Sequence, residues 1–359
     1  MKAKVHIHHP RKQRSRKSGL PPGTLVLIGE VKTKNPRLTL IDYGPSGLKE
    51  LELEGIQELR DYRRQHETLW VNLCGLQDTE LLREVSEFFG LHPLAIEDIL
   101  NTDQRPKLDD YVDILYLDLH LHRADNQGVI STDQISIALG KDFVFTVQEL
   151  STGTLEQVRQ RLRTDGSALR NHEADFLTYS ILDAIVDSHF FVIEQLSERC
   201  DLLEDEILNN AQPEIQHRLH QLKREITQLR RNFWPLRELL GNLQHIDSPL
   251  VNPKIHPYLR DVQDHVIHLV ESLEDLRDLI ISLQDIYLST LSHRVNLELR
   301  TLTVLATTFM PAALIAGIFG MNFKTMPWIE KPEGFILAMG LMATIALIML
   351  IAFWRRRMV

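Results

Sequence analysis

Two stretches without charged residues stand out near the C-terminal end of this 359-residue chain. The first covers residues 301–323 and the second residues 334–354, and a short segment with Lys and Glu separates them. Each has the roughly 20 residues that a helix needs to cross about 30 Å of hydrocarbon. The pattern predicts transmembrane helices over residues 302–323 and 334–354, joined by an external loop over residues 324–333.

Before the first span, apolar side chains recur at alternating intervals of four and three residues. The repeat comprises Leu269, Leu273, Leu276, Ile280, Leu283 and Tyr287. This is the spacing of a coiled-coil seam, and no Gly or Pro interrupts the chain between residue 258 and Pro311. We therefore predict one very long helix over about residues 258–319, in which a stalk over residues 251–301 continues into the first transmembrane helix.

Residues 171–250 are charged and helical in pattern, with a break at Gln212-Pro213. They predict an acidic hairpin of two antiparallel helices. Six acids lie between Glu194 and Glu206, against the single Arg199. A solvated acidic face and a surface that concentrates cations both explain this bias.

Residues 21–170 mix short β-rich runs with helical stretches, which predicts an α/β domain around a mostly buried sheet. A turn is predicted at Asp42-Tyr43-Gly44-Pro45 and a helix at residues 79–89. The β-rich runs are residues 24–28, 69–73, 112–121, 134–139 and 143–147. Residues 1–20 carry seven Lys or Arg and no acid, and predict a disordered basic tail. A metal site at its histidines and contact with anionic lipid are alternatives for this tail.

Charges and motifs narrow the class of protein. The two cysteines, Cys74 and Cys200, fit a reducing cytosol. Arginines precede the first span, and further arginines form a basic tail over residues 355–359 after the second span. Because positive charge favours the cytoplasmic side, we expect both termini in the cytoplasm. Neither GxxxxGK[ST] nor GxGxxG after a strand occurs. We expect no nucleotide, no nucleic-acid partner and no enzymatic activity.

The coiled-coil spacing continues into the first span with small and polar side chains. These are Asn296, Leu299, Thr303, Ala306, Met310, Ala313 and Gly317. Close packing of transmembrane helices explains the spacing, and so does a pore lined by polar and apolar rings. A pore requires several chains around one axis, because a single helix encloses no lumen.

A second candidate site lies in the stretch HPLAIEDIL at residues 92–100, followed by QRPK at residues 104–107. We predict a short helix that starts near His92-Pro93 and ends before Pro106. Glu97 and Asp98 fall in its later turns. They form either an ordinary solvated face or half of a cation site completed by another surface.

The sequence Phe-Gly-Met-Asn-Phe closes the first span at residues 319–323, after Phe-Met-Pro at residues 309–311. Upstream lie HPLAIEDIL with QRPK, YSILDA at residues 179–184 and RDVQDH at residues 260–265. Together these stretches resemble the CorA family of magnesium and cobalt transporters, in the Gly-Met-Asn superfamily of two-span metal ion transporters. The resemblance covers the chain from about residue 20 to its end.

The resemblance implies a funnel-shaped homopentamer in the cell inner membrane that conducts Mg²⁺, and also Co²⁺, driven by the membrane potential. Asn322 of the selectivity filter Gly320, Met321 and Asn322 would hold hydrated Mg²⁺, which gives up its water reluctantly. The implied pore-lining and gate residues are Asp285, Asn296, Leu299, Leu302, Thr303, Met310, Ala313 and Gly317. Ala313 departs from the Thr that relatives often carry at this position.

The same resemblance implies that cytosolic Mg²⁺ bound between protomers closes the channel. Its ligands would be Glu97, Asp98, Asp183 and Asp261. One alternative function is a zinc transporter of the same superfamily, although no His or Cys lies within residues 295–359 to bind a softer ion. A membrane-anchored Mg²⁺ sensor or scaffold without conduction is the alternative from another class.

Overall fold

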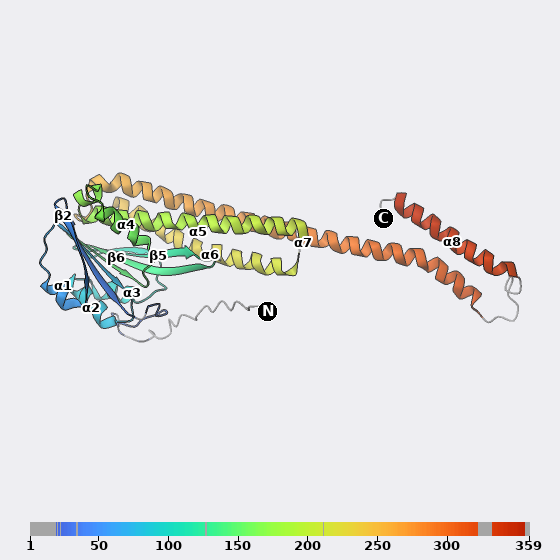
Figure 1. Cartoon of the computed structure of the whole chain (residues 1–359), viewed down its shortest axis with the longest axis horizontal. Helices are drawn as coiled ribbons and strands as arrows, with labels where there is room; N and C mark the ends of the chain where they lie inside the picture. The colour runs from blue at the N-terminus through green and yellow to red at the C-terminus, as the bar shows by residue number, and fades with distance from the viewer. Residues whose placement is uncertain are drawn as a thin grey trace. The chain divides into compact units, whose positions relative to one another are not determined.

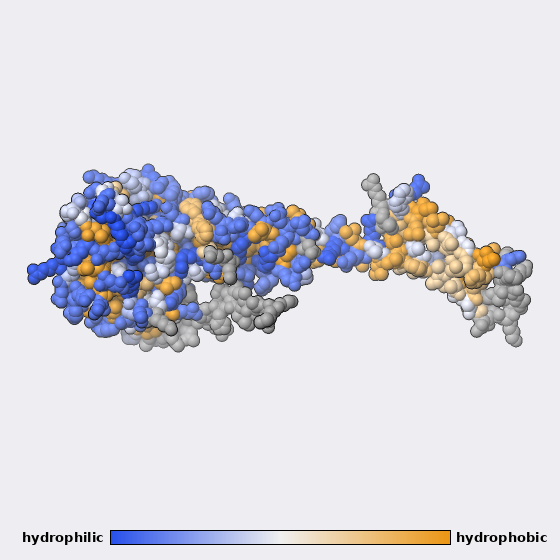
Figure 2. Space-filling model, in the orientation of Figure 1, coloured by the Kyte–Doolittle hydropathy of each residue, from blue (hydrophilic) through white to orange (hydrophobic). Residues whose placement is uncertain are grey.

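The computed structural model describes residues 19, 21, 23–33, 35–125, 128–210, 212–321 and 332–355. The chain divides into two compact units, Met1–Leu202 with Arg218–Ile280 and Leu203–His217 with Ile281–Val359. Figure 1 shows the order of the elements, and Figure 2 shows apolar side chains gathered over the final helix and the last part of the long helix before it. Asn322 and most of the predicted tails and external loop lie outside the described residues.

A seven-stranded mixed sheet forms the centre of the first unit, with the strand order β2-β1-β3-β7-β6-β5-β4. Strands β3 and β7 pair in parallel, and the other neighbours pair antiparallel. The strands are β1 (Arg37–Gly44), β2 (Gly47–Leu53), β3 (Thr68–Cys74), β4 (Lys107–Asp110), β5 (Leu115–Ala124), β6 (Ile130–Leu139) and β7 (Phe143–Gln148). Every residue of β3 is buried, as the prediction of a mostly buried sheet requires.

Helices lie on both sides of this sheet (Figure 1). The short helices α1 (Ile56–Asp61), α2 (Thr79–Phe88) and α3 (Pro93–Ile99) lie on one side. On the other side run α4 (Thr154–Arg163), α5 (Ala174–Asn210), α6 (Pro213–His245) and the first part of α7 (His256–Phe319). The 3₁₀ turns η2 (Ala168–Asn171) and η3 (Pro253–Ile255) precede α5 and α7.

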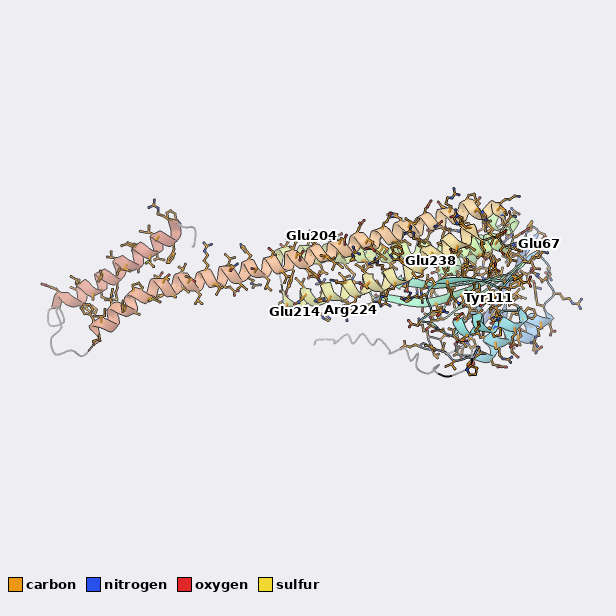
Figure 3. All side chains as sticks on the ribbon, turned by 180° about the vertical axis from the view of Figure 1, so that it is seen from behind. Glu67, Tyr111, Glu204, Glu214, Arg224 and Glu238 are labelled. Carbon is orange, nitrogen blue, oxygen red and sulfur yellow. The ribbon has the colours of Figure 1, made fainter. Side chains whose placement is uncertain are left out.

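Ion pairs join the long helices of the first unit. Arg230 of α6 contacts Glu274 of α7 at 2.7 Å, and Arg199 of α5 contacts Glu225 of α6 at the same distance. All six residues of the predicted seam are buried, with exposed fractions between 0% and 6%. Charged side chains such as Arg224 and Glu238 remain exposed on α6 (Figure 3). The seam is therefore covered within one chain, where the sequence pattern alone left its partner open.

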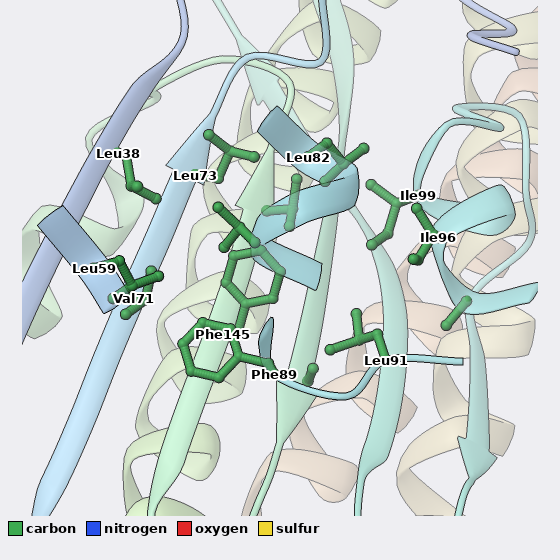
Figure 4. Close-up of a cluster of buried hydrophobic side chains, with 14 of the residues drawn as sticks. Leu38, Leu59, Val71, Leu73, Leu82, Phe89, Leu91, Ile96, Ile99 and Phe145 are labelled. Atoms are coloured by element: carbon green, nitrogen blue, oxygen red, sulfur yellow. The ribbon is translucent and has the colours of Figure 1, made fainter. Parts of the chain in front are cut away.

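The main hydrophobic core fills the space between the sheet and α1–α3 (Figure 4). Alternate strand residues point into it, as the two-residue period of a strand requires. From β3 it receives Val71 and Leu73, and from β7 it receives Phe145, which stacks on Phe89 at 5.2 Å. On the opposite face Trp70 donates to Thr146 at 3.0 Å. This packing fixes the positions of α3 and of the strands around it.

The second unit contains the remainder of α7 and helix α8 (Pro332–Arg355). Only 6% of the most apolar window of each helix is buried within the chain. Helix α5 also contains a window apolar enough to cross a membrane, but 61% of that window is buried. Long apolar helices with uncovered surfaces match the two predicted transmembrane spans, because such surfaces require lipid or further chains as partners.

The structure corrects three details of the sequence prediction. Residues 24–28 form no strand, and Ile28 makes only a single parallel bridge to Asn101. Strands β1 and β2 lay outside the predicted β-rich runs, and the segment predicted as a turn contains the end of β1. There Asp42 is fully buried and accepts hydrogen bonds from the Tyr62 hydroxyl and the Gln65 amide. Tertiary partners therefore allow an Asp inside a strand where the local sequence favours a turn.

Candidate functional site

Helix α3 carries Glu97 and Asp98, and its start follows the prediction. The His92 side chain accepts a hydrogen bond from the Leu94 amide, and Pro93 occupies the first helical turn. The His92 ring also stacks on the ring of Tyr111, with 5.0 Å between the two centroids. Tyr111 is labelled in Figure 3. The buried side chains of α3 lie in the main core. The helix is thus anchored on one face, while Glu97 and Asp98 stay half-buried on the other.

Asp98 already has a positively charged partner in its own chain. The Lys107 ammonium lies 2.7 Å from Oδ2 of Asp98 and also donates to Asp109. Burial acts to lower the pKa of Lys107, but its hydrogen bonds to Asp109 and Asp98 outweigh burial and raise the pKa to about 12. Lys107 therefore stays charged at neutral pH, and one cation occupies the space beside Asp98.

A buried polar group fixes the end of α3. The Gln134 amide nitrogen donates to the carbonyls of Asp98 and Ile99 at 3.1 and 3.4 Å, and to Asp118 at 3.2 Å. Ser136 donates to the other oxygen of Asp118 at 3.0 Å. Burial raises the pKa of Asp118 well above its usual range. These contacts attach the backbone of Asp98 to strands β5 and β6.

The segment before β1 contacts the Glu97 side chain. The Gly23 amide donates to a carboxylate oxygen of Glu97 at 2.6 Å. Further along, Ile28 donates to the Leu100 carbonyl at 2.8 Å, and Thr102 donates back to the Ile28 carbonyl. Glu97 is therefore positioned by the chain that precedes the sheet.

A group of candidate metal ligands lies between α5 and α7. Asp183, Asp187 and His265 each offer a ligand atom, and these atoms lie within 4.8 Å of one another. Asp183 and Asp187 are four residues apart on α5, so they share one face of the helix. Nδ1 of His265 is buried without a hydrogen-bond partner and lies 3.6 Å from Asp187. Among the residues that the structure describes, no other group of three His, Cys, Asp or Glu side chains brings its ligand atoms this close together.

The electrostatics of this group favour a cation. Burial raises the pKa of Asp183, and the neighbouring carboxylate of Asp187 raises it further. Arg161 lies 3.5 Å from Asp183 and offsets part of this repulsion. Burial raises the pKa of Tyr179, and the negative charges of Asp183 and Asp261 raise it further, to about 12. Two carboxylates and an imidazole at this spacing fit a divalent metal ion.

The structure does not bring all four predicted regulatory residues together in one chain. Asp183 and the exposed Asp261 belong to the helices on one side of the sheet, whereas Glu97 and Asp98 belong to α3 on the other side (Figure 1). A single chain therefore holds two separate halves of the predicted site.

The predicted pore-lining residues lie on α7 and are all exposed in the single chain. From Asn296 to Gly317 they recur mainly at intervals of three, four and seven residues, which keeps them near one face of a helix with 3.6 residues per turn. Leu302 lies at the edge of this face. Leu299 and Met310 are 55% and 67% exposed. The Thr303 hydroxyl donates to the Leu299 carbonyl at 2.8 Å, so its oxygen remains available as an acceptor.

Helix α7 ends beside the predicted selectivity filter. Gly320 donates to the Ala316 carbonyl at 2.9 Å, and a Cβ at Gly320 would lie 3.2 Å from that backbone oxygen. Glycine therefore permits this close approach. Met321 follows and is exposed, whereas Asn322 lies outside the described residues.

Sequence reasoning missed Asp187, His265 and Lys107 as neighbours of the candidate ligands. The four-residue interval from Asp183 to Asp187 was a usable signal, because it places both carboxylates on one face. The position of His265 opposite that face depends on how α7 packs on α5, and the sequence carries no signal for it.

The fold defines a membrane protein with an N-terminal mixed α/β domain, a long helix and apolar C-terminal helices. A comparison with protein families matches residues 66–357 to the family described as "CorA-like Mg2+ transporter protein". The "Cobalt/magnesium transport protein CorA" of Thermotoga maritima is 37% identical over 347 residues, which cover 96% of this chain and 99% of that protein. The chain therefore belongs to the CorA-like Mg²⁺ transporter family, a family of membrane transporters and not of enzymes.

Solved structures agree on the fold. The complete CorA magnesium transporter from Methanocaldococcus jannaschii has a TM-score of 0.76 at 20% identity and covers 92% of this chain and 98% of its own. The ZntB cytoplasmic domain from Vibrio parahaemolyticus has a TM-score of 0.56 at 11% identity, over 72% of this chain and 98% of that domain. At these identities the similarity shows the fold alone, and the fold does not distinguish one transported ion from another.

Proposed function

We propose that this chain is a channel for Mg²⁺, and also Co²⁺, that works as a homopentamer in the inner membrane with both termini in the cytoplasm. The observation that carries the proposal is the exposed face of α7, where polar and apolar side chains alternate toward Gly320. This face needs copies of itself around an axis to enclose a lumen. The 37% identical relative from Thermotoga maritima is described as a cobalt/magnesium transport protein.

In this mechanism Asn322 selects the ion at the outer mouth. Mg²⁺ keeps much of its water shell when it binds to proteins, so a ring of amide oxygens accepts hydrogen bonds from that shell. Below the ring, Met310 and Leu299 narrow the lumen and close it by dewetting. A divalent ion that moves inward gains about 4.6 kcal/mol per 100 mV, because each elementary charge gains about 2.3 kcal/mol. No nucleotide is needed.

Regulation follows from the two separated halves of the carboxylate site. Since α3, which carries Asp98, and the first part of α7, which carries Asp261, lie on opposite sides of the sheet of one chain, an ion bound by both residues must join two chains. Mg²⁺ between neighbouring protomers would offset the repulsion of these carboxylates and hold the closed state. Asp98 and Asp261 would hold one ion, with Glu97 and Asp183 near a second, and carboxylate oxygens suit this hard ion.

Influx into liposomes tests conduction. With a Mg²⁺-sensitive dye inside and a potential that is negative inside, the wild type should admit Mg²⁺, and Asn322→Ala should abolish the influx. Asn171→Ala removes an exposed amide next to α5 and serves as the matched control. Absence of wild-type influx would favour a sensor or scaffold without conduction. Influx of Zn²⁺ in preference to Mg²⁺ and Co²⁺ would favour a zinc transporter.

Limited proteolysis tests regulation separately. Mg²⁺ should protect the wild-type protein from protease, because it holds neighbouring chains together. Asp261→Ala should weaken this protection, since it removes a carboxylate from one half of the site. If Asp261→Ala is protected at the same Mg²⁺ concentration as the wild type, this result contradicts the assignment of Asp261 to the regulatory site.

A further inference from the structure

Lys107 is the last residue of the QRPK stretch, and the proposed function gives it no role. Its ammonium lies 2.7 Å from Asp98 and also contacts Asp109. The side chain is only 27% exposed, so it is a defined part of the structure and not a mobile surface lysine. A cation of the chain itself thus sits at a carboxylate that the proposed mechanism gives to Mg²⁺.

Lys107 and a divalent ion compete for Asp98 in this geometry. Mg²⁺ binds carboxylate oxygen at about 2.0–2.1 Å, or through water molecules of its shell. The Lys107 ammonium lies 2.7 Å from Oδ2 of Asp98, so an ion that binds this oxygen must take its place. An ion that binds the other oxygen meets the repulsion of the ammonium in a partly buried site. In both cases Lys107 opposes the arriving divalent ion.

The surroundings of Lys107 allow this displacement without unfolding. Lys107 and Asp109 are two residues apart on β4, so both side chains lie on the same face of the strand. The ammonium also lies 5.8 Å from the centroid of the Tyr116 ring. Asp109 and the ring face can hold the ammonium after it leaves Asp98, because both attract a cation.

We propose that Lys107 is a tethered cation that occupies Asp98 when Mg²⁺ is low and competes with Mg²⁺, and thereby sets the Mg²⁺ concentration at which the channel closes. This inference rests on the regulatory site of the proposed function. Displacement by the ion makes the apparent affinity of the site weaker than that of its carboxylates alone. A weak site of this kind responds to Mg²⁺ at higher concentrations than a bare carboxylate pair would.

The test uses the full chain in detergent and measures the Mg²⁺ midpoint of protection from chymotrypsin, which does not cleave at Lys. Lys107→Gln should lower the midpoint by about tenfold, which corresponds to ~1.4 kcal/mol of competition. Lys107→Arg keeps the charge and should remain closer to the wild type than to Lys107→Gln. Lys141→Gln removes an exposed lysine between β6 and β7 and should leave the midpoint unchanged.

Asp98→Asn separates this inference from the proposed function. If Asp98→Asn loses the Mg²⁺ response while Lys107→Gln keeps the wild-type midpoint, the competition is overturned and the regulatory site stands. If Asp98→Asn keeps the wild-type response, the regulatory site itself is overturned, and the competition with it. Calorimetric titration with Mg²⁺ gives a second measurement of the same shift. Should Lys107→Gln not fold, Lys107→Ala, which adds no chymotrypsin site, decides in its place.

Discussion

Nδ1 of His265 lies 3.6 Å from a carboxylate oxygen of Asp187. A histidine of α7 and the two carboxylates of Asp183 and Asp187 on α5 therefore form one group of candidate metal ligands. The first membrane span, in contrast, contains no His or Cys. Nitrogen ligands suit Co²⁺ and Zn²⁺ better than Mg²⁺, which prefers oxygen. The group between α5 and α7 and the span therefore offer different ligand chemistry, so a metal ion that the one prefers need not be the ion that the other prefers.

His265→Ala should weaken Co²⁺ binding to the detergent-solubilised protein by about tenfold, or ~1.4 kcal/mol, because Co²⁺ loses an imidazole ligand. Mg²⁺ binding should change little, since the carboxylates of Asp183 and Asp187 remain. Titration calorimetry with each ion measures both effects. His268→Ala, one turn further along α7 and exposed, is the control. An equal loss for both ions would contradict a role of His265 as a metal ligand.

Acid should destabilise the soluble domain through two buried histidines. Burial lowers the pKa of His189 to about 3 and lowers the pKa of His122 well below its usual value. The unfolded chain takes up protons near pH 6.5 while the folded chain does not, so folding stability falls as the pH drops from about 6.5 toward 3. Within that window His189 contributes a loss of about 1.4 kcal/mol per pH unit, and His122 acts in the same direction.

His189→Gln should make the thermal midpoint less dependent on pH between 7 and 5. Glutamine does not titrate, and its oxygen can accept the hydrogen bond that Nε2 of His189 accepts from the His122 amide at 3.3 Å. Differential scanning fluorimetry of the full chain measures the midpoints. His217→Gln, at an exposed position of α6, should keep the wild-type slope. Equal slopes in all three proteins would show that another group controls acid stability.

Met310→Ala should increase residual Mg²⁺ influx when cytosolic Mg²⁺ is high. A narrower side chain widens and wets the closed lumen, and a tenfold increase would correspond to about 1.4 kcal/mol less barrier. Leu305→Ala is the control, because five residues turn a helix by about 140° from Met310. The liposome assay with Mg²⁺ on both sides measures the leak. Greater leak in Leu305→Ala than in Met310→Ala would place the pore on the opposite face.

Much of the architecture was predictable from local pattern. The break at Gln212-Pro213 separates α5 from α6, and the start of α3 at His92-Pro93 follows from the geometry of proline. The seam from Leu269 to Tyr287 is buried as predicted. The resemblance carried by Gly320-Met321-Asn322 and the upstream stretches was confirmed by the family match. The roles of the pore and regulatory residues stay predictions.

The sequence by itself determined the two apolar spans, the long continuous helix before them and the family, because hydrophobic length, helical period and short motifs are properties of neighbouring residues. Only the tertiary structure decided that Lys107 occupies Asp98, that His265 meets Asp183 and Asp187, and that the helices carrying Asp98 and Asp261 lie on opposite sides of the sheet. These relations join residues far apart in the chain. They depend on strand pairing and helix packing, for which a single sequence gives no direct signal.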